Sequence, residues 1–72
     1  MDKPLRVGII GLGNIAKLHA GGWSESPHAK VVAGCDVDVE KFDFWEKEHG
    51  LKRLTVDADE LIDDPEIDII DI

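Results

Sequence analysis

The chain has 72 residues, one cysteine and a formal net charge of −8 at pH 7. This length accommodates one small domain at most, and a single cysteine excludes an internal disulfide. No apolar run approaches the roughly 20 residues needed to cross a bilayer, and an acidic chain is repelled by nucleic acid and anionic membranes. We therefore expect neither a membrane nor a nucleic-acid partner.

The start of the chain, Met1 to Pro4, lacks the basic segment and long apolar core of a secretory signal. Without such a leader or a disulfide, the expected location is cytoplasmic. Charge is unevenly distributed, since residues 1–35 carry four basic and two acidic side chains, whereas residues 36–72 carry four basic and fourteen acidic ones. We interpret the acidic half as solvated helix faces.

The first two predicted elements are a buried strand and a helix. Residues 5–10, which are apolar apart from Arg6 and Gly8, read as a buried strand. The helix is expected to begin near Asn14 and to end by Ser24, because two glycines weaken it and Ser26-Pro27 follows. Three of its side chains are expected to face the sheet: Ile15, Leu18 and Trp23.

A second strand and a second helix follow. Residues 30–35 read as the strand, and Asp38 is expected to cap the helix, which Gly50 suits as a C-terminal stop. Aromatic side chains at helical spacing are expected to pack between helix and sheet. These are Trp23, Phe42 and Trp45, whereas Phe44 is expected to be exposed.

The last third of the chain predicts a strand, a helix and another strand. Residues 53–56 form the short third strand. Asp57 opens the third helix, with Glu60 three residues on in the spacing of a capping box, and Pro65 ends it. Residues 67–72 read as a fourth strand.

A glycine motif lies between the first strand and the first helix. Its pattern, Gly-x-Gly-x-x-Ala, is that of a dinucleotide-binding loop. Gly11 permits the tight turn, Gly13 leaves space for a diphosphate, and Ala16 lets the helix lie close to the sheet. The backbone N–H groups of Asn14 and Ile15 are expected to face the phosphates at the positive end of the helix.

The acid at the end of the second strand strengthens this interpretation. Asp36 lies about 23 residues beyond Gly13, close to the spacing expected of the acid that binds the adenosine ribose. A 2′-phosphate would meet this carboxylate at a cost of about 4 kcal/mol for like charges 4 Å apart at an effective dielectric of 20. The nearest following base is Lys41. We therefore expect NAD as cofactor rather than NADP.

The alternation of strands and helices predicts an α/β fold built on a parallel sheet. The expected strand order is 3-2-1-4, the beginning of a Rossmann-type dinucleotide-binding domain that is truncated after its fourth strand. Residues 1–72 would then be the N-terminal portion of that domain, without a substrate domain.

Three segments together resemble one family of oxidoreductases. They are Val-Gly-Ile-Ile-Gly-Leu-Gly-Asn-Ile-Ala at residues 7–16 with Leu18-His19, Val-Ala-Gly-Cys-Asp-Val-Asp at residues 32–38, and Asp-Ala-Asp-Glu-Leu-Ile at residues 57–62 leading to Pro-Glu-Ile-Asp at 65–68. With these residues, almost the whole chain resembles the N-terminal part of the glucose–fructose oxidoreductase, inositol dehydrogenase and MocA-type family.

The resemblance implies NAD(P)-dependent oxidation or reduction of a sugar, a cyclic polyol or a related carbonyl compound. It also implies a second domain for the substrate and a Glu-Lys-Pro motif with a catalytic lysine. This chain has neither, and Lys3-Pro4 does not match the motif because it precedes the first strand. We expect no catalytic residue in the chain and a homo-oligomer for the full-length protein. The alternative is a non-catalytic NAD-sensing or regulatory nucleotide-binding module.

Histidine, cysteine and acid patterns do not indicate a metal site. The three histidines have no close mutual spacing, and Asp36-x-Asp38-x-Glu40 lacks the glycine and terminal acid of a calcium loop. His19 matches a histidine common in the family, and we expect it to be packed or hydrogen-bonded rather than catalytic. Cys35 is expected to be a small buried residue at a strand end.

Overall fold

A four-stranded parallel sheet organises the chain, as seen in a computed structural model that describes residues 3–72. The strands are β1 (Leu5–Ile10), β2 (Ala29–Cys35), β3 (Arg53–Thr55) and β4 (Ile69–Asp71). They lie in the order β3-β2-β1-β4, and every neighbouring pair is parallel. The predicted α/β fold and the strand order 3-2-1-4 are confirmed.

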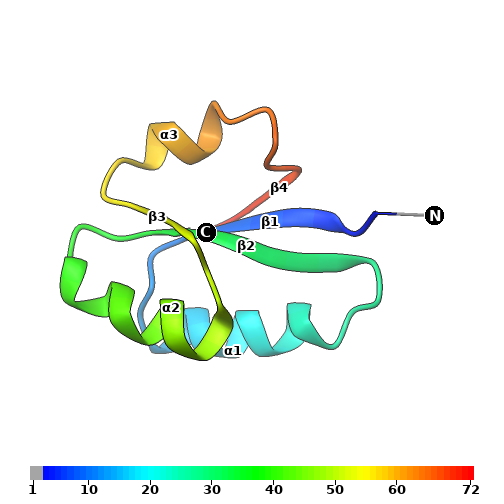
Figure 1. The fold of residues 1–72 in the computed structure, drawn as a ribbon, viewed down its shortest axis with the longest axis horizontal. Helices are drawn as coiled ribbons and strands as arrows, with labels where there is room; N and C mark the ends of the chain where they lie inside the picture. Colours follow the sequence, from blue (N-terminus) through cyan, green and yellow to red (C-terminus); the bar gives the residue numbers. More distant parts are fainter. Residues whose placement is uncertain (1–2) are drawn as a thin grey trace.

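Helices cover both faces of this sheet. They are α1 (Asn14–Ser24), a 3-10 turn η1 (Val39–Lys41) that leads directly into α2 (Phe42–His49), and α3 (Ala58–Ile62). Figure 1 shows α1 and α2 on one face and α3 on the other. The chain therefore leaves β1 toward one face and reaches β4 from the opposite face. The carboxyl ends of β1 and β4 mark the switch point at which such folds place their ligands.

The predicted helix ends are set by caps. The Asp38 side chain accepts a hydrogen bond from Glu40 N at 3.0 Å, and Gly50 ends α2 in the left-handed conformation with φ +68°. The Asp57 side chain caps α3 through Asp59 N at 2.9 Å. The predicted capping box is not formed, because the Asp57 side chain binds the N–H of Asp59 rather than that of Glu60, and the Asp57 N–H donates to the Thr55 hydroxyl oxygen rather than to the Glu60 side chain.

Element boundaries differ from the prediction at a few positions. Asp38 caps a 3-10 turn rather than the second α-helix itself. The second strand begins one residue earlier, at Ala29, and the third ends at Thr55. The fourth strand is limited to Ile69–Asp71, although Asp68 N also bonds the Arg6 carbonyl of β1 at 2.8 Å just before it.

The face of α1 that packs on the sheet differs from the predicted one. Ile15 and Leu18 were expected to face the sheet, but they are 63% and 72% exposed. Ala16 and Ala20 are buried instead, four residues apart on one face, and the half-buried Trp23 continues that face as predicted. Small side chains bring the helix axis close to the strands, so the larger ones are left on the outer side.

Two apolar clusters hold the layers together. The first cluster lies between the sheet and the helices α1 and α2, and it contains the fully buried side chains of Trp45, Val7 and Leu51. Phe42 packs against this cluster as predicted. Leu61 is fully buried on the other face against Ala33 and Cys35. Phe44 is exposed, as predicted.

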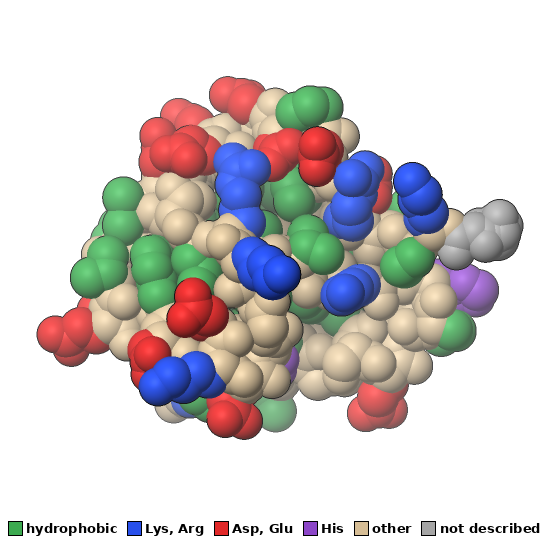
Figure 2. All heavy atoms as spheres, in the orientation of Figure 1, with side chains coloured by type: hydrophobic (Ala, Val, Ile, Leu, Met, Phe, Trp, Pro, Cys, Tyr) green, Lys and Arg blue, Asp and Glu red, His purple; other side chains and the backbone are tan. Residues whose placement is uncertain are grey.

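Acidic side chains on the helices of the second half of the chain are exposed to solvent, as predicted. Asp59, Glu60 and Asp63 of the α3 region are all exposed. Figure 2 shows acidic side chains gathered along the top of the view, over α3, and basic side chains spread across the middle of the same face. The charge of these helix residues is therefore hydrated and lies outside the core.

The free edge of β4 predicts self-association of a polypeptide made of these 72 residues alone. Among residues 3–72, β4 pairs only with β1, and Ile72 beside it is 87% exposed. Unpaired edges with apolar side chains template pairing between chains. Ile72→Lys should reduce the sedimentation coefficient measured at high concentration. Ile62→Lys, at an exposed position on α3, is the control. A monodisperse wild-type monomer would contradict this prediction.

Candidate functional site

The glycine loop joins β1 to α1 at the carboxyl edge of the sheet. Gly11 has a φ of +92°, a backbone conformation that residues other than glycine rarely adopt. Its N–H donates to the Cys35 carbonyl oxygen at 2.8 Å, which fixes the loop to the end of β2. A Cβ atom added at Gly13 would meet no heavy atom within 4 Å. The loop is therefore anchored on one side and open on the other.

The first turn of α1 begins directly on this open side. Gly13 occupies the N-cap position, and no side chain among residues 3–72 caps the helix there. Asn14 and Ile15 are exposed, whereas Ala16 is 4% exposed and its N–H bonds the Gly13 carbonyl at 3.1 Å. The unpaired first-turn N–H groups and the positive end of the helix dipole together favour an anionic group at this position.

Asp36 lies next to this loop, at the end of β2. Its Oδ2 accepts the Leu12 N–H at 2.9 Å, and its Oδ1 accepts the Asp38 N–H at 2.8 Å. The Lys41 ammonium lies 3.3 Å from Oδ2. The carboxylate therefore connects three segments, namely the glycine loop, the turn after β2 and the 3-10 turn η1.

The hydrogen bonds of Asp36 determine its acidity. The backbone N–H of Asp38 has the largest effect and that of Leu12 the next, and both lower the pKa of the Asp36 carboxyl. Burial acts in the opposite direction, and Lys41 lowers the pKa further. The net result is a pKa below the usual value, so Asp36 is a carboxylate, an acceptor of hydrogen bonds, at neutral pH.

A cavity of about 290 Å³ opens beside this acid and the loop. Its walls are largely apolar and come from the ends of β1 and β2, the segment after β3, and the start of α3. The lining residues are Ile10, Gly11, Cys35, Asp36, Val37, Val56 and Ala58. Val37 and Val56 are exposed, which leaves apolar surface uncovered at the mouth of the cavity. Such a surface fits a flat, apolar ring next to a polar group held by Asp36.

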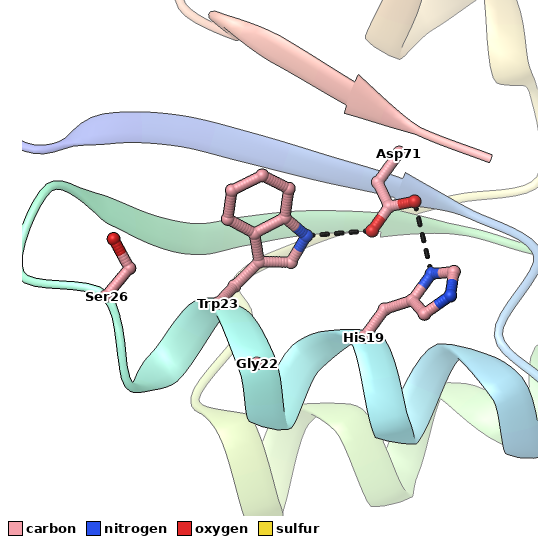
Figure 3. Close-up of a pocket in the computed structure, with 5 residues that line it drawn as sticks. All are labelled: His19, Gly22, Trp23, Ser26 and Asp71. Atoms are coloured by element: carbon pink, nitrogen blue, oxygen red, sulfur yellow. Dashed lines mark hydrogen bonds and ion pairs between the residues drawn. The ribbon is translucent and has the colours of Figure 1, made fainter.

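A second cluster lies between α1 and the end of β4. His19 Nδ1 lies 3.1 Å from Asp71 Oδ1, and Trp23 Nε1 donates to Asp71 Oδ2 at 2.8 Å, as Figure 3 shows. With Gly22 and Ser26 they line a cavity of about 470 Å³. This cluster links the helix after the glycine loop to β4. The prediction that His19 is packed or hydrogen-bonded is confirmed.

The remaining chemistry is limited. Cys35 is buried as predicted, and burial, followed by nearby acids, raises the pKa of its thiol. Within residues 3–72, no three His, Cys, Asp or Glu side chains are placed to hold a metal ion together. None of the helices that these residues form is both long and apolar enough to span a bilayer.

Comparison with known proteins identifies the family. Residues 5–72 match the GFO_IDH_MocA oxidoreductase family, described as an NAD-binding Rossmann fold. The match covers more than half of the chain, so the chain belongs to this family. The family resemblance predicted from the sequence motifs is thereby confirmed, as is the Rossmann-type fold.

Relatives of known structure and sequence agree with this assignment. The uncharacterized oxidoreductase YrbE of Bacillus subtilis is 39% identical over 70 residues, or 97% of this chain and 20% of that protein. Myo-inositol 2-dehydrogenase of Thermotoga maritima is 32% identical over 92% of this chain and 20% of its own length. A crystal structure of scyllo-inositol dehydrogenase from Lactobacillus casei with bound NAD(H) and scyllo-inositol is similar with a TM-score of 0.84, at 32% identity over 94% of this chain and 20% of that one.

This chain therefore spans about 20% of the length of the relatives that it matches. The family description for the matched residues is an NAD-binding Rossmann fold, and the loop of Gly11 and Gly13 lies at the first strand–helix turn of this chain.

The sequence-predicted residues Gly11, Gly13, Asn14, Ile15, Ala16 and Asp36 lie together at the carboxyl edge of the sheet. Sequence reasoning missed the contacts of Leu12 and Lys41 with the acid, and the apolar walls formed by Val37 and Val56. The position of Val56 follows from the pairing of β3 with β2, which the predicted strand order includes, but the strand order does not specify which side chains line the cavity. Lys41 was noticed as the nearest base, but its distance from Asp36 depends on the 3-10 turn.

The lowered pKa of Asp36 predicts a specific pH dependence of stability. Its folded-state pKa lies below the unfolded value of about 3.9, so its stabilising contribution is fully present above that value. The contribution is lost as the pH falls through the folded-state pKa. Asp36→Asn should lower the free energy of unfolding at pH 7 by about 1–3 kcal/mol, because it weakens charge-assisted hydrogen bonds.

Denaturant unfolding of both proteins between neutral and strongly acidic pH measures this difference. The stabilities of the wild type and Asp36→Asn should begin to converge as the pH falls below the unfolded-state pKa, and the difference should be lost below the folded-state pKa. A difference that is independent of pH would contradict the assignment of the stabilising effect to the ionised carboxylate. Asp43→Asn, at an exposed carboxylate on α2, is the matched control and should leave the profile nearly unchanged.

Proposed function

We propose that this chain binds the adenosine diphosphate half of NAD, within a dehydrogenase that acts on a sugar, a cyclic polyol or a related carbonyl compound. Gly13, Asn14 and Ile15 present backbone N–H groups to the diphosphate, and Gly11 and Ala16 give the loop and helix the required positions. Asp36 accepts hydrogen bonds from the hydroxyls of the adenosine ribose. The nicotinamide supplies hydride-transfer chemistry, for which this chain provides binding and orientation.

One observation supports this proposal above the others. The same Asp36 carboxylate that lies at the expected ribose position also accepts the N–H of Leu12, inside the glycine loop, at 2.9 Å. The diphosphate position and the ribose position are therefore fixed relative to each other by one hydrogen bond. The apolar cavity next to Asp36 has the size and lining for the adenine ring.

The relatives support the enzymatic interpretation over the regulatory one. The compared proteins are named as oxidoreductases or dehydrogenases, two of them for inositols, and one was solved with NAD(H). We therefore favour a cyclic polyol as the substrate class. Parts of the protein outside residues 1–72 would bind this substrate. The homo-oligomeric state and the cytoplasmic location expected from the sequence remain predictions.

Calorimetric titration with NAD and NADP tests the site. The wild-type protein should bind NAD with the lower Kd, because the Asp36 carboxylate disfavours a 2′-phosphate. Gly13→Val should raise the Kd for NAD by at least about tenfold, or 1.4 kcal/mol, because the branched side chain fills the open side of the loop where the diphosphate lies.

Gly21→Val is the matched control, since Gly21 lies in α1 beyond the loop and its Cβ would also meet no atom within 4 Å. It should leave the Kd for NAD nearly unchanged. Circular dichroism establishes that both variants are folded. Tighter binding of NADP than of NAD, or an unchanged NAD affinity in folded Gly13→Val, would refute the proposed site.

A further inference from the structure

Lys41 is the cation that pairs with the proposed ribose-binding acid. Its ammonium lies 3.3 Å from Asp36 Oδ2, and the Lys41 side chain is 40% exposed whereas that of Asp36 is 10% exposed. The 3-10 turn sets this contact, because the Lys41 N–H bonds the Asp38 carbonyl at 3.1 Å and directs the chain back toward the end of β2. Asp36, which lines the cavity, and Lys41 therefore form an ion pair without net charge.

The hydrogen-bond capacity of the Asp36 carboxylate is nearly filled. A carboxylate offers about four lone-pair positions. Two are taken by the N–H groups of Leu12 and Asp38, and a third is taken by Lys41. The first two donors belong to the main chain and are fixed, whereas the Lys41 ammonium lies on a flexible stem. Two ribose hydroxyls that bind this carboxylate would therefore displace Lys41, which would remain within reach of the ribose.

We propose that Lys41 is a second specificity-determining residue. It strengthens the binding of NADP and so reduces the preference for NAD over NADP that Asp36 establishes. This inference rests on the proposed function. NADP differs from NAD by a phosphate on the 2′-oxygen of the ribose that Asp36 is proposed to bind, so that phosphate would lie beside Asp36 and within reach of the displaced ammonium. The ammonium has three donors, and at most one of them is used by Asp36.

Titration of NAD and NADP into the wild type, Lys41→Met and Lys47→Met tests this inference. Lys41→Met keeps the length of the side chain and removes its charge. It should raise the Kd for NADP about tenfold, the effect of losing one charge-assisted contact, and change the Kd for NAD by less than about threefold. Lys47 is a matched control, because it pairs with Asp43 at 3.2 Å on the exposed side of α2. Lys47→Met should leave both Kd values unchanged.

The ratio of the two Kd values separates the possible outcomes. A larger ratio of the Kd for NADP to the Kd for NAD in Lys41→Met than in the wild type, together with a ratio close to wild type in Lys41→Arg, supports the inference. An equal change of both Kd values would overturn it, since Lys41 would then act only by holding Asp36 in place. Failure of the wild-type protein to bind either nucleotide would refute the proposed function and this inference together, whereas NAD binding with an unchanged ratio refutes the inference alone.

Discussion

The hydrogen bond from the Leu12 N–H to the Asp36 carboxylate is the interaction on which the site depends. It crosses from the glycine loop to the end of β2, two segments 24 residues apart in the chain. The Gly11 N–H bond to the Cys35 carbonyl supports it one residue earlier. Together the two bonds determine where the loop begins, and therefore where the first turn of α1 points its N–H groups.

Close packing beneath the loop is a second condition for this geometry. Leu12 is 1% exposed, and a Cβ atom at Gly34 would lie only 3.0 Å from one of the Leu12 methyl carbons. The absence of a side chain at Gly34 thus provides the space that Leu12 fills. Ala16 has the same role on α1, since its small side chain lets the helix approach the sheet. The packing of Leu12 against the sheet and the hydrogen bonds to the end of β2 together position the loop.

Most of the fold was predictable from the sequence because its signals are local. Gly50 and Asp57 indicated helix ends through their caps, and the largely apolar segment of residues 5–10 predicted β1 at its observed bounds. The inward face of α1 was predicted wrongly. Hydrophobicity favours burial of Ile15 and Leu18, whereas the close approach of helix and sheet leaves room only for small side chains such as alanine. Size, rather than polarity, decides which face is buried there.

The candidate site was predictable in its residues but not in its connections. Glycine spacing and the strand-terminal acid identified Gly13 and Asp36 from the sequence alone. The contact between Asp36 and Lys41 depends on a 3-10 turn where a regular helix was expected, and the Asp71 cluster depends on β4 lying beside β1. The first contact spans only five residues and depends on the backbone geometry of that turn, whereas the second joins residues 48 and 52 positions apart across α1 and β4. Local residue patterns specify neither side-chain contact.

The most direct test of the central claim is an NMR titration of the ¹⁵N-labelled protein with NAD. The backbone amide signals of Gly13, Asn14 and Ile15 should shift most, together with that of Asp36, because diphosphate and ribose bind at these positions. Shifts confined to His19, to the Trp23 indole and to Asp71 would place the nucleotide in the other cavity and contradict the account.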